Sequence, residues 1–200
     1  LTLPEGEPFD PALDEQGLLR QIRLDMGQVI SARRRTLYPN AAWGRSFNNE
    51  APELSDREVL VEYTAHPDAR FHLPQGRPIP VARLAGGAKA GPLTPIAPAT
   101  QRVRLRIVEK GSAKPVAAKL HVHGEAGEYL APVDRPRLPN YAWFEDYGPD
   151  FVHQNTHACT YVPGETVIDL PLGRVYLEIS KGFEIKPIRK AVTVTKATET

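Results

Sequence analysis

The sequence predicts an all-β protein that contains an antiparallel β-sandwich, with a proline-rich N-terminal β region before it. Twenty prolines are spread over the 200 residues, and proline lacks the backbone donor that helix interiors and central strands use. Several short segments alternate apolar and polar side chains, as half-buried strands do. Glycine and proline mark the gaps between these segments, which is typical of strands joined by ordered turns.

The bulk composition is that of a globular protein. Hydrophobic residues make up 41% and charged residues 24% of the chain, so a core can form. The net charge is +1, with 11 basic against 12 acidic residues up to residue 98 and 14 against 12 after it. This balance argues against nucleic acid as a partner, because such binders carry a concentrated basic surface. No apolar run reaches the roughly 18 residues of a membrane span.

Cysteine content and the first residue bear on localisation. Cys159 is the single cysteine, so an intramolecular disulfide cannot form. This fits a reducing compartment and equally fits many exported bacterial proteins. The sequence begins with Leu1 and not with methionine, as a mature protein or a segment of a longer one would. Localisation is therefore open, and the first residue favours export.

The first half is expected to be short strands and loops. Residues 1–16 suggest an extended arm or loop. Residues 14–35 allow a helix, from the near-helical spacing of Leu18, Leu19, Ile22 and Met26, or strands, from the alternation in "RQIRLDM". We favour strands because the rest of the chain is β-like.

Later segments of the first half follow the same rules. Residues 38–56 have no periodicity and predict a long loop, whereas residues 57–66, "REVLVEYTAH", predict a strand. "ARFHLP" and "RPIPVARL" suggest short edge strands limited by their prolines. Residues 85–100 are small and rich in proline and glycine, so we interpret them as a linker. The chain is divided accordingly into a β-rich region, 1–98, and a sandwich, 99–200.

The second half has the clearer strand pattern. In "QRVRLRIVEK", Val103, Leu105 and Ile107 alternate with three arginines, which predicts a half-buried strand with a basic outer face. Strands are also expected in "VAAKLHVHG", "ETVIDLP", "RVYLEISKG" and "FEIKPIRKAVTVT". A long stretch, residues 128–165, should be mostly loop. Several short strands at this spacing indicate an antiparallel, Ig-like sandwich.

The second half also resembles a known family. "GSAKPVAAKL" and "YVPGETVIDLPLGRVYLEISKGFEIKPIRKAVTV" are similar to the opening and closing segments of the transthyretin-like, or carboxypeptidase-regulatory-like, β-sandwich. The form is similar to the modules that precede the catalytic domain in CehA/McbA-type metallohydrolases, and it covers about residues 101–195. The resemblance implies that the metal-binding residues of such hydrolases lie in a separate domain after the sandwich, so it assigns no catalytic residue here.

Four histidines form the candidate metal site. His121 and His123 are two residues apart on an expected strand, and their side chains therefore share a face. His153 and His157 form a second close pair. Together they could supply four nitrogens to zinc, copper or nickel, provided that all four converge on one point. The alternative is a solvated strand face together with loop histidines bonded to backbone, in which case no cofactor is needed.

Two aromatic and polar stretches are candidate ligand sites. The first, residues 38–52, contains Trp43, Arg45, Asn48 and Asn49, and the second, residues 138–151, contains Tyr141, Trp143 and Glu145. Aromatic faces stack on sugars, while amide and guanidinium groups bond hydroxyls or carboxylates. The alternative is that the aromatic rings pack these loops onto the strands.

Two other features have simpler interpretations. Cys159 is expected to be a buried small hydrophobe, since no third group is evident that would complete a Cys–His nucleophile. The run Arg33–Arg35 is expected to lie on a solvated or salt-bridged strand.

We therefore favour a non-catalytic accessory or recognition module of a larger or secreted bacterial-type protein, with carbohydrate or protein as its ligand. A metal-dependent hydrolase, or a fragment of one, and a structural spacer are the alternatives; self-association is plausible.

Overall fold

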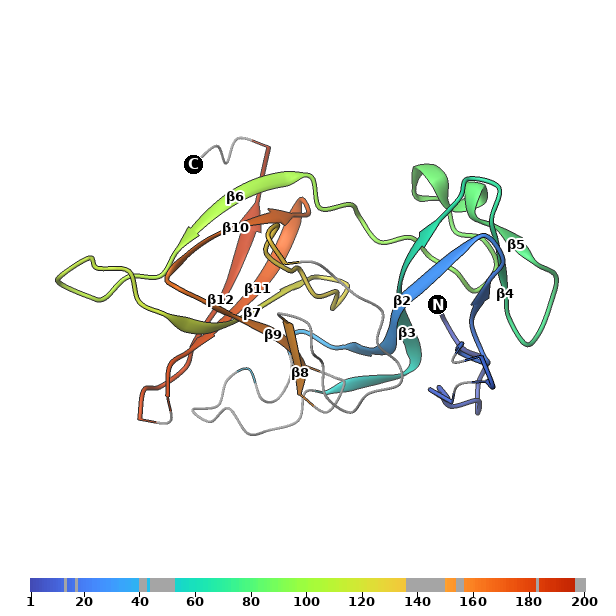
Figure 1. The fold of residues 1–200 in the computed structure, drawn as a ribbon, viewed down its shortest axis with the longest axis horizontal. Coiled ribbons are helices and arrows are strands. Elements are labelled where there is room, and N and C mark those ends of the chain that lie inside the picture. Colours follow the sequence, from blue (N-terminus) through green and yellow to red (C-terminus); the bar gives the residue numbers. More distant parts are fainter. Residues whose placement is uncertain are drawn as a thin grey trace. The chain divides into compact units, whose positions relative to one another are not determined.

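The computed structural model describes residues 1–12, 14–16, 18–39, 43, 53–135, 150–153, 157–182 and 184–196. These residues form antiparallel sheets and a short 3₁₀ helix, Val81–Gly87, which confirms the expected all-β class (Figure 1). They fall into two compact units. Unit 1 contains residues 1–35 and 55–96, and unit 2 contains residues 36–54 and the described residues from 97 onward. The division at residue 98 stays a prediction.

The described residues of unit 1 form five strands. β1 (Arg23–Leu24), β4 (Arg70–His72) and β5 (Ile79–Pro80) form one sheet in the order β1-β4-β5. The long strands β2 (Gly27–Thr36) and β3 (Leu54–Ala65) pair with each other. The strand interpretation of residues 14–35 is therefore confirmed over the helical one for the segments that become β1 and β2.

The core of unit 1 gathers residues from distant parts of the sequence. Its buried members are Leu3, Ile22, Val59, Phe71 and Leu93. Leu93 is only 4% exposed, and the backbone amides of Ala90 and Leu93 donate to each other's carbonyl oxygens. The linker interpretation is therefore wrong for this part of residues 85–100, because burying a large side chain opposes free motion of its backbone.

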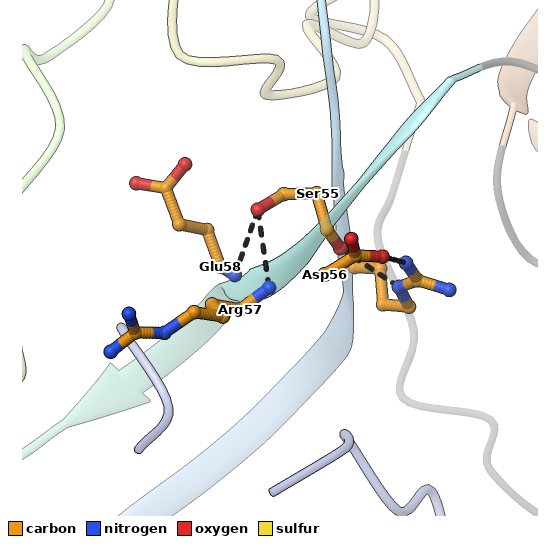
Figure 2. A network of polar contacts seen from close by, with 5 residues as sticks. Ser55, Asp56, Arg57 and Glu58 are labelled. Carbon is orange, nitrogen blue, oxygen red and sulfur yellow. Dashed lines mark hydrogen bonds and ion pairs between the residues drawn. The ribbon is translucent and has the colours of Figure 1, made fainter. Parts of the chain in front are cut away.

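A serine side chain organises the start of β3. The Ser55 hydroxyl accepts hydrogen bonds from the backbone amides of Arg57, at 3.3 Å, and Glu58, at 3.0 Å, as Figure 2 shows. On the same strand, Asp56 accepts from Arg34 at 2.7 Å, and Glu58 accepts from Arg35 at 2.8 Å. The expected salt-bridged strand is thus confirmed for two of the three consecutive arginines.

Unit 2 contains a five-stranded sheet and a two-stranded ribbon (Figure 1). The sheet has the order β12-β11-β7-β9-β8, and the ribbon pairs β10 with β6. The bounds are β6 Gln101–Arg106, β7 Ala118–Gly124, β8 Asp150–His153, β9 His157–Val162, β10 Glu165–Leu170, β11 Gly173–Ser180 and β12 Ile188–Val194. β8 and β9 lie inside the stretch that was expected to be mostly loop.

The core of unit 2 lies between this sheet and the ribbon. β6 supplies Val103 and Leu105, and β11 supplies Val175, Leu177 and Ile179. The remaining buried members come from the other strands and from the segment after β7: Leu120, Val122, Leu130, Val162, Ile168, Leu170 and Val194. The three arginines of β6 point outward and form ion pairs with Glu165 and Asp169 of β10.

Glycines permit two close approaches in unit 2. Gly173 begins β11 with a φ of +110° and allows the tight turn from β10. Gly164 has a φ of +114°, and a Cβ there would lie 2.6 Å from the backbone nitrogen of Val116. Among the described residues, no helix is long and apolar enough to cross a membrane.

Candidate functional site

The candidate site is the face of the five-stranded sheet that lies opposite the unit 2 core. We call it the second face and define it by His121 and His123 of β7, Tyr176 and Glu178 of β11, and Arg189 of β12. The strand register places His123 opposite Tyr176, His121 opposite Glu178, and Glu178 opposite Arg189. Side chains alternate between the two faces of a strand. On β7 and β11 the residues next to these in sequence point into the core, so these residues lie on the opposite face.

The second face is buried, although most of its members are polar. His121 and His123 are each 2% exposed, Tyr176 is 4% exposed and Glu178 is 7% exposed. The interpretation of a solvated strand face is therefore wrong. Sequence alternation correctly placed the two histidines together, but it carries no information about whether other residues cover that face.

An ion pair lies within this layer. The guanidinium Nε of Arg189 donates to the Glu178 carboxylate at 2.8 Å, and the two side chains are 8% and 9% exposed. Paired burial is needed because an isolated charge in such a position would be far more costly than a hydrogen-bonded one. No local sequence pattern indicates this pair, since its two residues are eleven positions apart on different strands.

Residues between β2 and β3 cover part of the second face. We call Leu37–Pro39 together with Trp43 the strap. The ring of Tyr38 stacks on His123, with 5.1 Å between centroids, and on Tyr176, with 5.0 Å between centroids. Trp43 meets Tyr38 and Tyr176 edge-on, at 5.7 and 5.4 Å. These are favourable geometries for aromatic pairs, so they support the packing interpretation for Trp43.

The strap also makes polar contacts. The Tyr38 hydroxyl lies 3.2 Å from His123 Nδ1, and the backbone amide of Leu37 donates to the carbonyl oxygen of Glu53 at 2.8 Å. Burial, and to a smaller extent the nearby Glu178 carboxylate, raise the pKa of the Tyr38 hydroxyl well above its usual value, while Arg189 acts in the opposite direction. The hydroxyl therefore keeps its proton over the ordinary pH range.

The structure brings the two histidine pairs into one sheet. β9 pairs with β7 on one side and with β8 on the other, and His153 is the register partner of His157. The pairing of β7 with β9 ends at Leu120 and Thr160. Among the residues whose side chains are described, no group of three or more His, Cys, Asp or Glu could hold a metal ion. The side chains of His153 and His157 lie outside that part of the structure.

The remaining candidate residues have different outcomes. Cys159 is 2% exposed, which confirms that it is a buried residue. Most of the predicted ligand residues, namely Arg45, Asn48, Asn49, Tyr141, Trp143 and Glu145, lie outside the described residues. Tyr161 was not singled out by the sequence, yet it is 59% exposed on β9. Its two-residue spacing places it on the same strand face as the buried Cys159, so the alternation in the sequence does not indicate that Tyr161 is exposed.

Comparisons with protein-family models, curated proteins and solved structures give no significant match to this chain.

Proposed function

We propose that this chain is a non-catalytic accessory or recognition module of a larger or exported protein. In this proposal, residues 101–195 form a transthyretin-like sandwich, and the ligand is a carbohydrate or a partner protein. The observation that supports it best is the coverage of the second face by Tyr38, which stacks on His123 and Tyr176 at about the same distance, 5.1 and 5.0 Å.

Because Tyr38 and Trp43 cover part of the second face, its residues are better suited to packing than to catalysis. A general acid or base must come within hydrogen-bond reach of the substrate. On the second face, His123 Nδ1 instead meets the Tyr38 hydroxyl, and the Glu178 carboxylate is engaged by Arg189. These groups use their hydrogen-bonding capacity to hold the layer together.

A surface for recognition is available on β9. Tyr161 is 59% exposed, Val133 is 49% exposed, and an Arg135 guanidinium nitrogen donates to the carbonyl oxygen of Tyr161 at 3.3 Å. Tyrosine and arginine are the residues most often found at the energetic centres of interfaces, and tyrosine also stacks on sugar rings. A rigid strand holds this tyrosine in place, which lowers the entropic cost of binding.

Calorimetric titration of the whole chain with soluble cello-, xylo- and chito-oligosaccharides tests the carbohydrate form of the proposal. We expect saturable binding to one class, weakened at least about tenfold by Tyr161→Ala, which corresponds to loss of a contact worth about 1.4 kcal/mol. Ile188→Ala, which truncates a side chain 49% exposed on β12, is the matched control and should bind like the parent. No heat with any oligosaccharide would exclude these sugars and favour a protein ligand.

Turnover assays distinguish the module from the hydrolase alternative. The chain is expected to leave phosphodiester, carboxylic ester and amide reporter substrates unchanged, with and without added zinc. Hydrolysis that is lost in His123→Phe and kept in Tyr161→Ala would contradict the proposal, because it would place chemistry on the second face.

A metal-binding function is the second candidate, and the strand arrangement favours it. The last register pair of β7 and β9 is Leu120 with Thr160. Three residues further along each strand lie His123 on β7 and His157 on β9. His153 is in turn the register partner of His157 on β8. One sheet therefore carries both predicted histidine pairs, as a site built from neighbouring strands requires.

Metal analysis tests this second candidate. The metal hypothesis expects about one equivalent of zinc, copper or nickel per chain, lost in the double variant His153→Ala, His157→Ala. The double variant His66→Ala, His72→Ala changes two histidines of unit 1 and should retain the metal. A parent chain that takes up none of these ions in equilibrium dialysis would end this hypothesis.

A further inference from the structure

The strand β6 has one open edge within the described part of unit 2. It pairs with β10 on one side, and no described residue pairs with it on the other. The carbonyl oxygen of Val167, whose register partner is Arg104, accepts from the Val133 amide and so points away from β6. Hydrogen-bonded and non-hydrogen-bonded partners alternate along an antiparallel pair. The backbone groups of Arg102, Arg104 and Arg106 therefore point away from β10, toward the open edge.

The unit 2 core is less completely covered along β6 than along β10. Val103 and Leu105 of β6 pack against this core but are only half-buried, whereas Ile168 and Leu170 of β10 are 2% and 6% exposed. Val103 and Ile168 are register partners, so the difference arises from what lies beside each strand. Apolar area is therefore left beside β6 that an added strand would bury.

The outer face of the ribbon carries more positive than negative charge. Arg104 and Arg106 share one carboxylate, that of Glu165, at 3.3 and 3.5 Å, while Arg102 pairs with Asp169 at 2.9 Å. Three arginines thus face two carboxylates, and all three arginine side chains are more than half exposed. Opposite charges across a strand pair stabilise it and like charges destabilise it, so this edge favours a strand that carries carboxylates.

The same charges disfavour pairing of β6 with a second copy of itself. Antiparallel self-pairing centred on Arg104 would place this residue opposite its own copy, and Arg102 opposite Arg106, on the outer face. Like charges directly opposite each other are destabilising, and charged side chains commonly protect edge strands from self-association. The partner that fits this edge is therefore an acidic strand from another protein.

We propose that the open edge of β6 binds an extended acidic segment of another protein, which adds to the ribbon as an antiparallel strand. Its apolar residues would lie beside Val103 and Leu105, and its acidic residues would lie opposite the three arginines. Backbone hydrogen bonds supply the affinity in strand addition, and alternate side chains supply the specificity. This surface uses no residue of β9, so sugar binding at the exposed tyrosine of that strand neither supports nor excludes the proposal.

Fluorescence anisotropy of a labelled peptide tests the proposal on the whole chain. The probe is a capped peptide of alternating valine and glutamate that begins and ends with valine, with one glutamate for each arginine of β6. We expect saturable binding of this peptide and at least about tenfold weaker binding of its valine–lysine counterpart, because lysine would face arginine.

N-methylation of the peptide distinguishes backbone pairing from charge attraction alone. In the proposed register the glutamate amides donate to β6, whereas the valine amides point away from it. Methyl groups on the glutamate nitrogens should abolish binding, and methyl groups on the valine nitrogens should leave it unchanged. Bound peptide should also slow hydrogen exchange at the amides of Arg102, Arg104 and Arg106. These measurements use the parent chain and do not depend on a variant that must fold.

A charge swap assigns the binding to β6. Arg104→Glu should weaken binding of the glutamate peptide at least about tenfold, and lysine in place of the central glutamate of the peptide should restore binding to this variant. Arg174→Glu changes an exposed arginine of β11, so it is the matched control and should bind the glutamate peptide as the parent does.

Three outcomes would overturn the proposal. The first is a parent chain that does not bind the glutamate peptide, since the arginines would then only protect the edge. The second is binding that survives methylation of the glutamate nitrogens. The third is a parent chain that sediments as a dimer and becomes monomeric in Arg104→Pro, a change that an edge strand tolerates, because a second copy would then occupy the edge.

Discussion

At the scale of single residues, the second face depends on polar side chains that satisfy one another. Glu178 and Arg189 are almost as buried as the apolar core, at 9% and 8% side-chain exposure. A buried pair of this kind is worth little compared with two apolar residues, but loss of one partner leaves a charge without compensation. The pair therefore makes the fold sensitive to single substitutions and tolerant of a matched double one.

Arg189→Met should lower the free energy of unfolding by about 3–5 kcal/mol. The double variant Glu178→Met, Arg189→Met should recover most of this loss, because no charge is left buried. Arg102→Met breaks the exposed pair with Asp169 and should cost below about 1 kcal/mol. Urea unfolding measures all three; equal losses in the single and double variants would contradict this account.

Gly164 and Gly111 distinguish the cost of an unfavourable backbone conformation from the cost of a steric clash. Both have positive φ, +114° and +96°, but a Cβ at Gly164 meets Val116 and Pro115 whereas a Cβ at Gly111 meets nothing within 4 Å. Alanine at either position costs about 1–3 kcal/mol of strain, and we expect Gly164→Ala to lose more because the backbone must also move. Comparable unfolding midpoints for the two variants would argue against the steric contribution.

The raised pKa of Tyr38 predicts that the free energy of unfolding falls at alkaline pH. Its pKa is raised in the folded state, so its neutral form contributes stability that is complete below its unfolded pKa of about 10 and is lost as the pH rises above that value. Tyr38→Phe has no proton to lose. Between pH 9 and 11, the free energy of unfolding should therefore fall more steeply for the parent than for the variant, and parallel curves would contradict the assignment.

At the scale of elements, alternating side chains define β6, and a local side-chain network lies near the start of β3. β6 has alternate residues inward, and its arginines pair with β10 across the outer face. β3 begins where the Ser55 hydroxyl accepts from the Arg57 and Glu58 amides. A side chain that accepts from backbone donors in this way gives them a local partner near the start of the strand.

Ser55→Ala should lower the free energy of unfolding by about 1 kcal/mol, the ordinary worth of a hydroxyl that satisfies backbone amides. Ser55→Thr keeps the hydroxyl and suits a strand, so it is the matched control. Thermal unfolding checks both. If the alanine variant unfolds at the same temperature as the threonine variant, the hydroxyl has no stabilising role.

At the scale of the whole molecule, the two units are not consecutive in sequence. β2 and β3 hold most of their length in unit 1, while residues 36–54 between them belong to unit 2. Part of the second face of unit 2 is therefore covered by Tyr38 and Trp43, which precede β6 by more than fifty residues. Such a long-range contribution cannot be read from periodicity, which reports only on neighbours.

Residues 97–200 expressed without the strap should expose His123 and Tyr176. We expect this fragment to bind the dye ANS more strongly and to unfold at lower urea than unit 2 does in the whole chain, because Tyr38 and Trp43 no longer cover the aromatic face. A fragment as stable as the parent would show that the strap adds no stability.

The sequence alone determined the all-β class, the alternation that fills the unit 2 core and the shared face of His121 and His123. These follow from side-chain period and from glycine and proline placement, which act over a few residues. Only the tertiary structure decided that this shared face is buried, that Tyr38 and Trp43 lie on it, that Glu178 meets Arg189 and that Leu93 packs into the core of unit 1. The physical reason is that burial depends on which distant segments cover a surface, and no local pattern records that choice.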